Sequence, residues 1–279
     1  MIFIKTRWRA LSASLFLVSL LGCQSQETTR FKLLDATATG VTFANTVTES
    51  EAINVLKYGY FYNGGGVAAG DFNNDGLVDL YFTGNMTADR LYLNKGAMQF
   101  EDVTGVAGIN HGGWKTGVSL VDINDDSWLD IYICRSTADD PELRRNLLYV
   151  NQKNGKFIEQ AAQYGLDDDS YSTQAAFFDY DHDGDLDCFL LNHSVQEYAG
   201  FSNLIASYRE KSDTRYGSKL LRNDEGEFTD ATATSGLVSN VLSFGLGLNV
   251  SDLNNDGWLD LYVTNDYNEN DYLYLNQQN

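Results

Sequence analysis

One acidic nine-residue pattern occurs four times in the chain and contains the residues best suited to chemistry. Its copies run over residues 71–79, 122–130, 179–187 and 252–260, and are called loops 1 to 4 here. Each copy has oxygen-bearing side chains at its first, third, fifth and ninth positions. Several such oxygens can converge on one cation when the sixth residue, usually glycine here, adopts a positive φ. The pattern therefore predicts metal-binding loops.

The ligand chemistry favours calcium. Hard, charged oxygen ligands select calcium over zinc or copper, and magnesium is disfavoured because it demands a strict octahedron with retained waters. We expect up to four Ca²⁺ ions, each held by the side chains of positions one, three, five and nine and by the backbone carbonyl of position seven. The expected ligands are Asp71, Asn73, Asp75, Leu77 and Asp79; Asp122, Asn124, Asp126, Trp128 and Asp130; Asp179, Asp181, Asp183, Asp185 and Asp187; and Asp252, Asn254, Asp256, Trp258 and Asp260.

An EF-hand and a metal-free Asp-rich turn are the two alternatives for these loops. An EF-hand needs a bidentate Glu at position twelve, where this chain has Phe82, Ile133, Leu190 and Val263. Metal-free Asp-rich turns stay open as an alternative, although turn chemistry alone does not demand Asp at position nine of every copy. Loop 3, with four acidic ligands, is expected to bind most tightly, and loop 2, with Ser127 in place of glycine, most weakly.

The sequence around the loops repeats as well. A run of small residues precedes each loop and an apolar strand such as Leu80–Phe82 follows it. A second strand and a turn come next, and in the first three units a strand that begins with Phe. Units of about four strands are typical of propeller blades. We expect an all-β propeller with four blade units at about residues 31–109, 110–166, 167–237 and 238–279.

The third unit is lengthened by residues 194–216. Leu204, Ile205 and Tyr208 fall at helical spacing there, which predicts a short helix or loop inserted on one face. Such an insertion is either surface decoration or a partner-binding element.

The N-terminus reads as a targeting segment. Basic residues are followed by an apolar run from Leu11 to Leu21, which is too short to span a bilayer of about 30 Å. Residues 1–22 are therefore expected to be a signal peptide. Residues 20–23 resemble a bacterial lipobox, which would make Cys23 a lipidated residue and residues 23–30 a tether. An ordinary cleaved secretory signal or an uncleaved anchor are the alternatives.

Composition excludes several classes of protein. The 279 residues include 39 acidic and 19 basic side chains, a formal charge of −20, which argues against nucleic-acid binding. A hydrophobic share of 43% is too high for intrinsic disorder. Three cysteines make no disulfide framework, and Cys134 and Cys188 lie in apolar strands as expected buried thiols.

No catalytic constellation is visible in the sequence. His182 is embedded in loop 3, and His111 and His193 have no evident nucleophile partner in sequence. Acid pairs are abundant but are better assigned to metal than to glycoside hydrolysis. We therefore expect a protein that is not an enzyme.

The repeat units resemble the FG-GAP or VCBS repeat of integrin-α-type β-propellers. More narrowly, residues 61–71, 91–96 and 100–104 resemble the cartilage-acidic-protein, or ASPIC/UnbV, type found in lipoproteins of Bacteroidota. The resemblance implies a propeller of about seven blades, often followed by an ASPIC/UnbV domain, whose Asp loops hold calcium. Only four loops are present, so we expect a fragment with an incomplete ring, or else a small closed ring. Residues 31–40 resemble the missing strand of the last unit and could complete it.

These observations together predict a calcium-stabilised, non-catalytic scaffold on a surface-anchored lipoprotein. It would bind an extracellular protein or glycan, as in adhesion, and contact the outer membrane through its N-terminal lipid, with no nucleic-acid partner. The alternative is the propeller portion of a polysaccharide-degrading enzyme such as a lyase.

Overall fold

The computed structural model describes residues 29–137, 140–195, 205–267 and 269–278. The chain divides into two units, Met1–Leu34 and Asp35–Asn279. In the first unit, residues 29–34 contain neither helix nor strand. The expected signal peptide, Cys23 and most of the tether lie outside the described residues. Among the described residues, no helix has the length and apolar character needed to cross a membrane.

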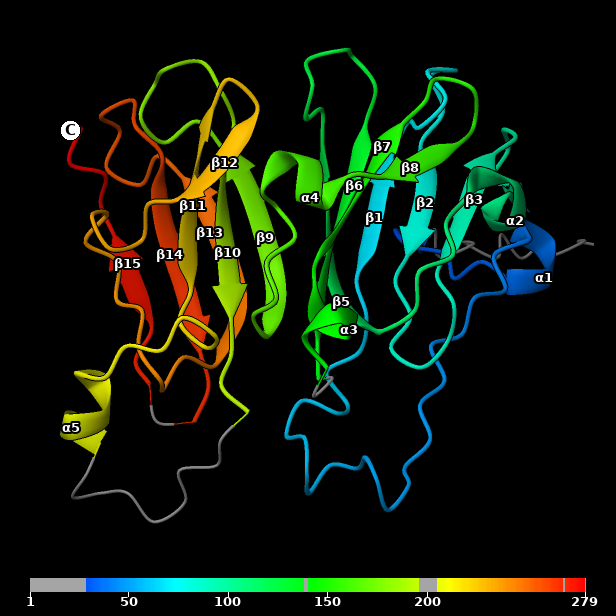
Figure 1. Cartoon of the computed structure of the whole chain (residues 1–279). Coiled ribbons are helices and arrows are strands. Elements are labelled where there is room, and N and C mark those ends of the chain that lie inside the picture. Colours follow the sequence, from blue (N-terminus) through cyan, green and yellow to red (C-terminus); the bar gives the residue numbers. More distant parts are fainter. Residues whose placement is uncertain (1–28, 138–139, 196–204, 268, 279) are drawn as a thin grey trace, which may run out of the picture. The chain divides into compact units, whose positions relative to one another are not determined.

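The second unit consists of four antiparallel sheets that follow one another in chain order (Figure 1). The first three have four strands each and the last has three. Their strands are β1 (Val67–Gly70), β2 (Asp79–Phe82), β3 (Arg90–Asn94) and β4 (Phe100–Asp102); β5 (Trp114–Val121), β6 (Asp130–Ser136), β7 (Leu147–Asn151) and β8 (Phe157–Glu159); β9 (Ser172–Phe178), β10 (Asp187–Asn192), β11 (Lys219–Asp224) and β12 (Glu227–Asp230); and β13 (Gly245–Ser251), β14 (Asp260–Asn265) and β15 (Tyr272–Tyr274).

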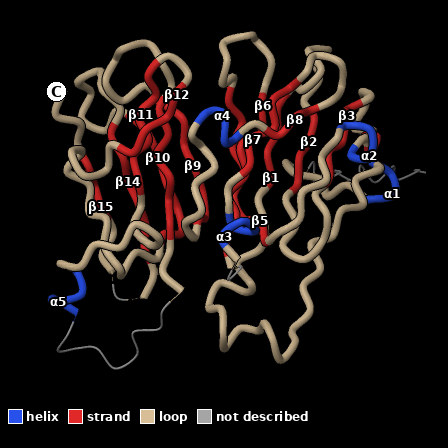
Figure 2. Tube along the Cα trace, viewed as in Figure 1, coloured by secondary structure: helices blue, strands red, loops and turns tan. Residues whose placement is uncertain are grey.

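In the residues that the structure describes, helix is confined to short turns beside the sheets (Figure 2). They are α1 (Ala36–Thr39), α2 (Thr104–Ala107), α3 (Pro141–Arg144), α4 (Ala161–Tyr164) and α5 (Ile205–Arg209). The last of these lies in the expected insertion of the third unit. Each sheet is a simple meander in which consecutive strands pair, so each sheet is one propeller blade.

Neighbouring sheets contact one another through their first strands, β1 with β5, β5 with β9, and β9 with β13. Small residues permit this approach. A Cβ added to Gly117 in β5 would overlap the carbonyl oxygen of Thr173 in β9. This explains the small residues that precede each loop, because a larger side chain would push the sheets apart.

The faces of the sheets form a series of apolar cores. The residue two positions after the ninth Asp of each loop points toward the next sheet. Tyr81, Tyr132 and Phe189 occupy this position in the first three sheets and are fully buried. Tyr262 occupies it in the fourth sheet and is 39% exposed. The fourth sheet is therefore uncovered on this face, because no described sheet packs against it.

The expected all-β propeller with four blade units and an incomplete ring is confirmed. Among the described residues the fourth sheet has no outer strand, and the sheets do not close a ring. Residues 31–40 do not supply that strand as expected. Ala36–Thr39 form α1, whose C-terminal Gly40 packs against the backbone of Phe100 in the first sheet.

An aromatic cluster that the sequence did not predict lies before β1. Tyr58, Tyr60 and Phe61 from the connection into β1 pack with Trp114 of the second sheet and with Phe244, which directly precedes β13 of the fourth sheet. These contacts join distant sheets through one segment. Cys134 and Cys188 are buried free thiols in the core between the second and third sheets, as expected.

Candidate metal centre

The four Asp loops occupy equivalent places. Each joins the first and second strands of its sheet, and all four lie at the same end of the second unit (Figure 1). Adjacent loops touch. The side-chain amide of Asn74 in loop 1 donates to the carbonyl of Ser127 in loop 2 at 3.1 Å, and the rings of His182 and Trp258 stack between loops 3 and 4.

The loop backbones share one conformation. The sixth residue has positive φ in every copy, and Ser127 in loop 2 adopts φ 66° where the other loops have glycine. The fourth residue is also left-handed, a feature that the sequence reasoning missed. Asn74, Asp125, His182 and Asn255 occupy that position. The residue types at the fourth position could have indicated this conformation, because Asn, Asp and His tolerate a left-handed backbone better than other side chains.

The ninth Asp of every loop is buried and has a structural role. In loop 3, the carboxylate of Asp187 accepts backbone N–H groups from Tyr180 at 3.1 Å and Asn223 at 2.8 Å. The same two bonds recur at Asp79, Asp130 and Asp260. This residue therefore ties its loop to the third strand. Its recurrence is explained without a cation, so it does not by itself separate metal loops from metal-free turns.

The first Asp of loops 1, 2 and 4 is satisfied within its own turn. In loop 1, both carboxylate oxygens of Asp71 accept backbone N–H groups, from Asp75 at 3.1 Å and Gly76 at 2.7 Å. Asp122 and Asp252 make the equivalent pairs of bonds. The fifth residues, Asp75, Asp126 and Asp256, accept the N–H of the seventh residue, so they also serve as turn acceptors.

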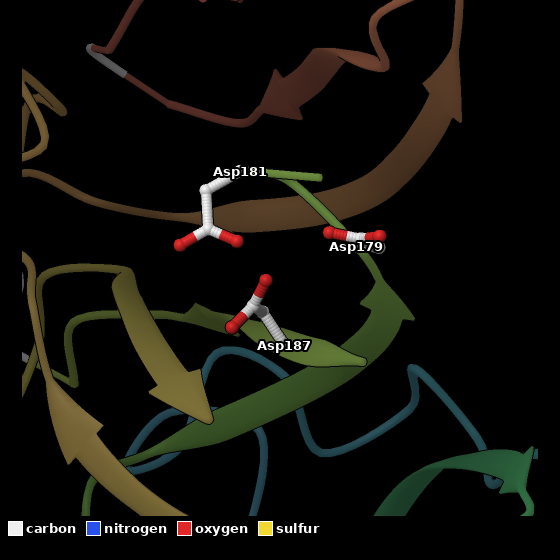
Figure 3. A group of neighbouring side chains, drawn as sticks. All are labelled: Asp179, Asp181 and Asp187. Atoms are coloured by element: carbon white, nitrogen blue, oxygen red, sulfur yellow. The ribbon is translucent and has the colours of Figure 1, made fainter. Parts of the chain in front are cut away.

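Loop 3 differs from the other loops. Asp179, Asp181 and Asp187 bring one carboxylate oxygen each to within 4.8 Å of one another. Figure 3 shows the carboxylates of Asp181 and Asp187 turned toward each other, with that of Asp179 beside them. No other group of three acidic, His or Cys side chains in the described part of the chain meets that spacing. Loops 1, 2 and 4 have Asn at the third position.

Two oxygens of this cluster lack hydrogen-bond partners. Asp179 Oδ1 and Asp181 Oδ1 are buried and accept no hydrogen bond. Leaving a buried carboxylate oxygen unpaired is costly, and a cation would satisfy it. The donor set, three carboxylates with oxygens only, fits a hard cation.

The electrostatics of the cluster also favour a positive ion. Burial raises the pKa of Asp187 to about 6, with Asp181 and Asp183 adding repulsion, although two backbone N–H groups oppose the rise. Burial also raises the pKa of Asp181, and the charges of Asp183 and Asp179 raise it further. Like charges held together in a partly buried site are relieved by a bound cation.

The side chains of the other two expected residues of loop 3, Asp183 and Asp185, accept backbone N–H groups; at Asp185 the expected ligand is the backbone carbonyl. Asp183 accepts the N–H of Asp185 at 2.9 Å. The Asp185 side chain accepts the N–H of Glu225 at 3.1 Å, in the turn between β11 and β12. Thus three of the four predicted carboxylate ligands of loop 3 converge, and the side chain at position seven links the loop to the outer strands.

A buried hydroxyl–imidazole pair is formed by Ser136 and His193, which lie six residues after the ends of loops 2 and 3. His193 Nδ1 lies 3.0 Å from the carbonyl of Ser194, to which it donates, so Nε2 accepts from Ser136 Oγ at 2.7 Å. Both side chains are buried. The pair therefore links the end of β6 to the residue that follows β10, and its burial gives no access to a substrate.

Comparisons with known proteins agree with the repeat pattern. Residues 71–133 match the FG-GAP-like repeat family, a span that begins at the first Asp of loop 1 and contains loop 2. Cartilage acidic protein 1 from Mus musculus is 31% identical over 121 residues, which is 43% of this chain and 17% of the relative. Cartilage acidic protein 1 from Homo sapiens is 28% identical over 152 residues, 50% of this chain and 22% of the relative.

The chain thus spans about a fifth of the length of the curated relatives it matches. The matches confirm the resemblance drawn from the Asp loops and their flanking strands. This chain carries an FG-GAP-like repeat on propeller blades and is related, at modest identity, to cartilage acidic protein 1.

Proposed function

We propose that the chain is a calcium-stabilised, non-catalytic β-propeller scaffold, and that loop 3 is its principal calcium site. The observation that carries the proposal is the cluster of Asp179, Asp181 and Asp187, two of whose buried oxygens have no hydrogen-bond partner. The repeat similarity supports a scaffold, because the blades are its shared feature.

Within this proposal the three carboxylates hold the ion, and the ion supplies the positive charge that the buried cluster lacks. Asp187 connects the site to β11, because its carboxylate accepts the N–H of Asn223. Asp185 connects loop 3 to the turn between β11 and β12, because its carboxylate accepts the N–H of Glu225. Ordering loop 3 therefore orders the third blade on the face where all four loops lie.

The remaining loops are proposed as weaker sites. Their first and fifth Asp residues must give up bonds to their own backbone, or share oxygens, before they ligate an ion. A site that must rearrange binds less tightly than one whose ligands already converge. Calcium at extracellular concentrations still stabilises a fold at affinities of about 10⁻⁴ to 10⁻³ M.

The ordered loop face is the proposed binding surface for an extracellular protein or glycan. Trp128 and Trp258 lie on it at position seven of loops 2 and 4, and both are partly exposed. Aromatic side chains of this kind suit contact with either partner. We further propose that the protein is exported and held at the outer membrane by a lipid on Cys23. Labelling with radioactive palmitate tests this, since Cys23→Ser should abolish incorporation.

Isothermal titration with calcium tests the central proposal. We expect binding by the wild-type chain and a higher melting temperature with calcium, with magnesium far less effective. The double variant Asp179→Asn/Asp181→Asn should lose the tightest binding step. The matched double variant Asp71→Asn/Asp75→Asn in loop 1 should retain that step. Absence of calcium binding by the wild-type chain, or an unchanged tightest step in the loop 3 variant, contradicts the proposal.

A further inference from the structure

A pocket of about 390 Å³ lies where the first strands of the four sheets begin. Its walls include Val67 of β1, Val118 of β5, Gln174 of β9 and Leu246 of β13. The Asp loops follow the ends of these strands, so the pocket lies at the opposite end of the second unit (Figure 1). Because the first strands of propeller blades surround a central channel, it is called the axial pocket here.

The residues that line the axial pocket all belong to the second unit. They range from Tyr58 to Leu246, and none of them belongs to β15 or to the residues after it. The volume lies within the range of about 300–1,000 Å³ that is usual for small-molecule sites. The pocket is therefore formed by the inner ends of the blades, and its size suits a small molecule.

Three of the four first strands are irregular at the axial pocket. The pair Thr116-Gly117 in β5, Thr173 in β9 and Leu246 in β13 lie where the register against the second strand shifts by one residue. All of these residues line the pocket. β-Bulges redirect side chains and are frequent beside binding sites. Their recurrence at one place in three sheets shapes the wall of the pocket.

Hydroxyl groups fix this wall between successive sheets. Thr83 Oγ1 of the first sheet donates to the carbonyl of Thr116 in β5 at 2.7 Å. Thr116 Oγ1 donates to the carbonyl of Ser172 in β9 at 2.8 Å. Thr173 Oγ1 donates to the carbonyl of Gly245 in β13 at 3.2 Å. The wall is therefore shaped before a ligand enters, which lowers the cost of binding.

Gln174 departs from the repeat at the axial pocket. It is the fifth residue before its Asp loop, where the other three sheets have glycine, at Gly66, Gly117 and Gly247. Its side chain is partly buried and lines the pocket. The carboxamide forms no hydrogen bond within the described residues. Both its donor and its acceptor are therefore available to a ligand.

The lining is uncharged. Among the described residues, no Asp, Glu, Lys, Arg or His lines the pocket. Its apolar part includes Val67, Val118 and Leu246. Tyr60, another lining residue, has a buried hydroxyl without a hydrogen-bond partner. An ion would find no opposite charge here, and a purely apolar ligand would leave the polar groups unpaired.

A neutral sugar residue matches this lining. Each sugar hydroxyl both donates and accepts, and a carboxamide presents a donor and an acceptor side by side, so it can pair with two adjacent hydroxyls. The C–H groups of the ring suit the valine and leucine side chains. We propose that the axial pocket binds a neutral sugar residue, with the Gln174 carboxamide as its main polar contact. The proposal rests on the blade scaffold and is independent of calcium and of the loop face.

Saturation-transfer difference NMR of the full chain tests the site, with the methyl glycosides of glucose, galactose, mannose and xylose as probes. We expect at least one of them to bind. Gln174→Gly should weaken that binding at least about fivefold in Kd. Glycine occupies the equivalent position in the other sheets, so the fold accommodates it. Gln174→Met, of similar length but without the amide, should weaken binding in the same way.

The control is Trp128→Ala on the loop face, which should bind the glycoside as the wild type does. Absence of binding by all four glycosides, or equal binding by Gln174→Gly and wild type, overturns the proposal. Loss of binding in Trp128→Ala but not in Gln174→Gly would place the sugar on the loop face and would also overturn it.

Methyl NMR locates the bound sugar. The methyl signals of Val67, Val118 and Leu246 should shift during titration with the glycoside, because these residues line the axial pocket. The signals of Leu253, an exposed residue of loop 4, should stay in place. The reverse pattern contradicts the proposal. Calcium binding is measured separately on the loop 3 variants, so failure of either proposal can be told from failure of the other.

Discussion

The imidazole of His182 stacks on the indole of Trp258, with ring centroids 3.8 Å apart and planes inclined by 11°. His182 is the fourth residue of loop 3, and Trp258 is the seventh residue of loop 4. The contact joins two different Asp loops through residues that are 76 positions apart in sequence. A change in the conformation of loop 3 therefore changes the environment of the Trp258 indole in loop 4.

This stack predicts an optical signal for calcium binding. We expect calcium to change the fluorescence of the wild-type chain and His182→Asn to remove most of that change. Asn already occupies the equivalent left-handed position in loops 1 and 4, at Asn74 and Asn255, so the backbone tolerates it. Loss of one aromatic pair should cost about 0.5–1.5 kcal/mol. A calcium response that is identical in His182→Asn would show that the ring contact does not link the loops.

The ninth Asp predicts a cost that does not depend on calcium. Replacing Asp187 by Asn places an amide group against one of two backbone donors, Tyr180 or Asn223, and leaves that donor unpaired. We expect Asp187→Asn to lower the free energy of unfolding by about 1–3 kcal/mol in chelator. Urea denaturation measures it. The control is Asp183→Asn at an exposed position of the same loop, expected within about 0.5 kcal/mol of wild type. Equal stability of all three chains would contradict the structural role.

Ser127 predicts a stabilising substitution. It holds φ 66° where loops 1, 3 and 4 use glycine. We expect Ser127→Gly to raise the free energy of unfolding by about 0.5–1 kcal/mol, since glycine adopts this backbone without strain. The reciprocal change Gly76→Ser, at φ 84° in loop 1, should lower it by a similar amount. Thermal melts in chelator measure both, and effects of the same sign would contradict the argument.

His193 predicts a loss of stability in mild acid. Burial lowers its pKa to about 4, well below the value of about 6.5 for an unfolded chain. Between these values the unfolded chain binds the proton and the folded chain does not, so stability present above pH 6.5 is lost as the pH falls toward 4. The loss reaches about 3 kcal/mol from this residue. Protonation would also end acceptance from Ser136 at Nε2.

Proton NMR titration checks this directly, with the three histidines assigned by single His→Gln variants. The His193 ring signal should keep its neutral position down to about pH 5. Comparing the pH dependence of unfolding of wild type and His193→Gln isolates its contribution from carboxylates such as Asp187, whose raised pKa acts in the opposite direction. A His193 signal that titrates near pH 6.5 would contradict the predicted burial effect.

The repeat unit could be recognised in the sequence because each blade is built from segments that lie close together in the chain. A dozen residues contain the loop from Asp71 to Asp79, its sixth glycine and the strand after it. Their spacing can therefore be read directly from the sequence. The number of blades and the open ring followed from counting loops. The ninth Asp was recognised, but its partner was not, because Asn94 lies 15 residues further on and donates through its backbone.

The sequence by itself determined the blades, the loops and the chemistry of their oxygens, since residue type and short-range spacing set turn conformation and strand pairing. Only the tertiary structure decided which loop gathers its carboxylates, because the hydrogen bonds of Asp71 and the unpaired oxygens of Asp179 depend on small differences in loop shape. It also decided that Tyr58, Trp114 and Phe244 share one core. Contacts between residues so far apart arise from how sheets stack, and local patterns do not record that.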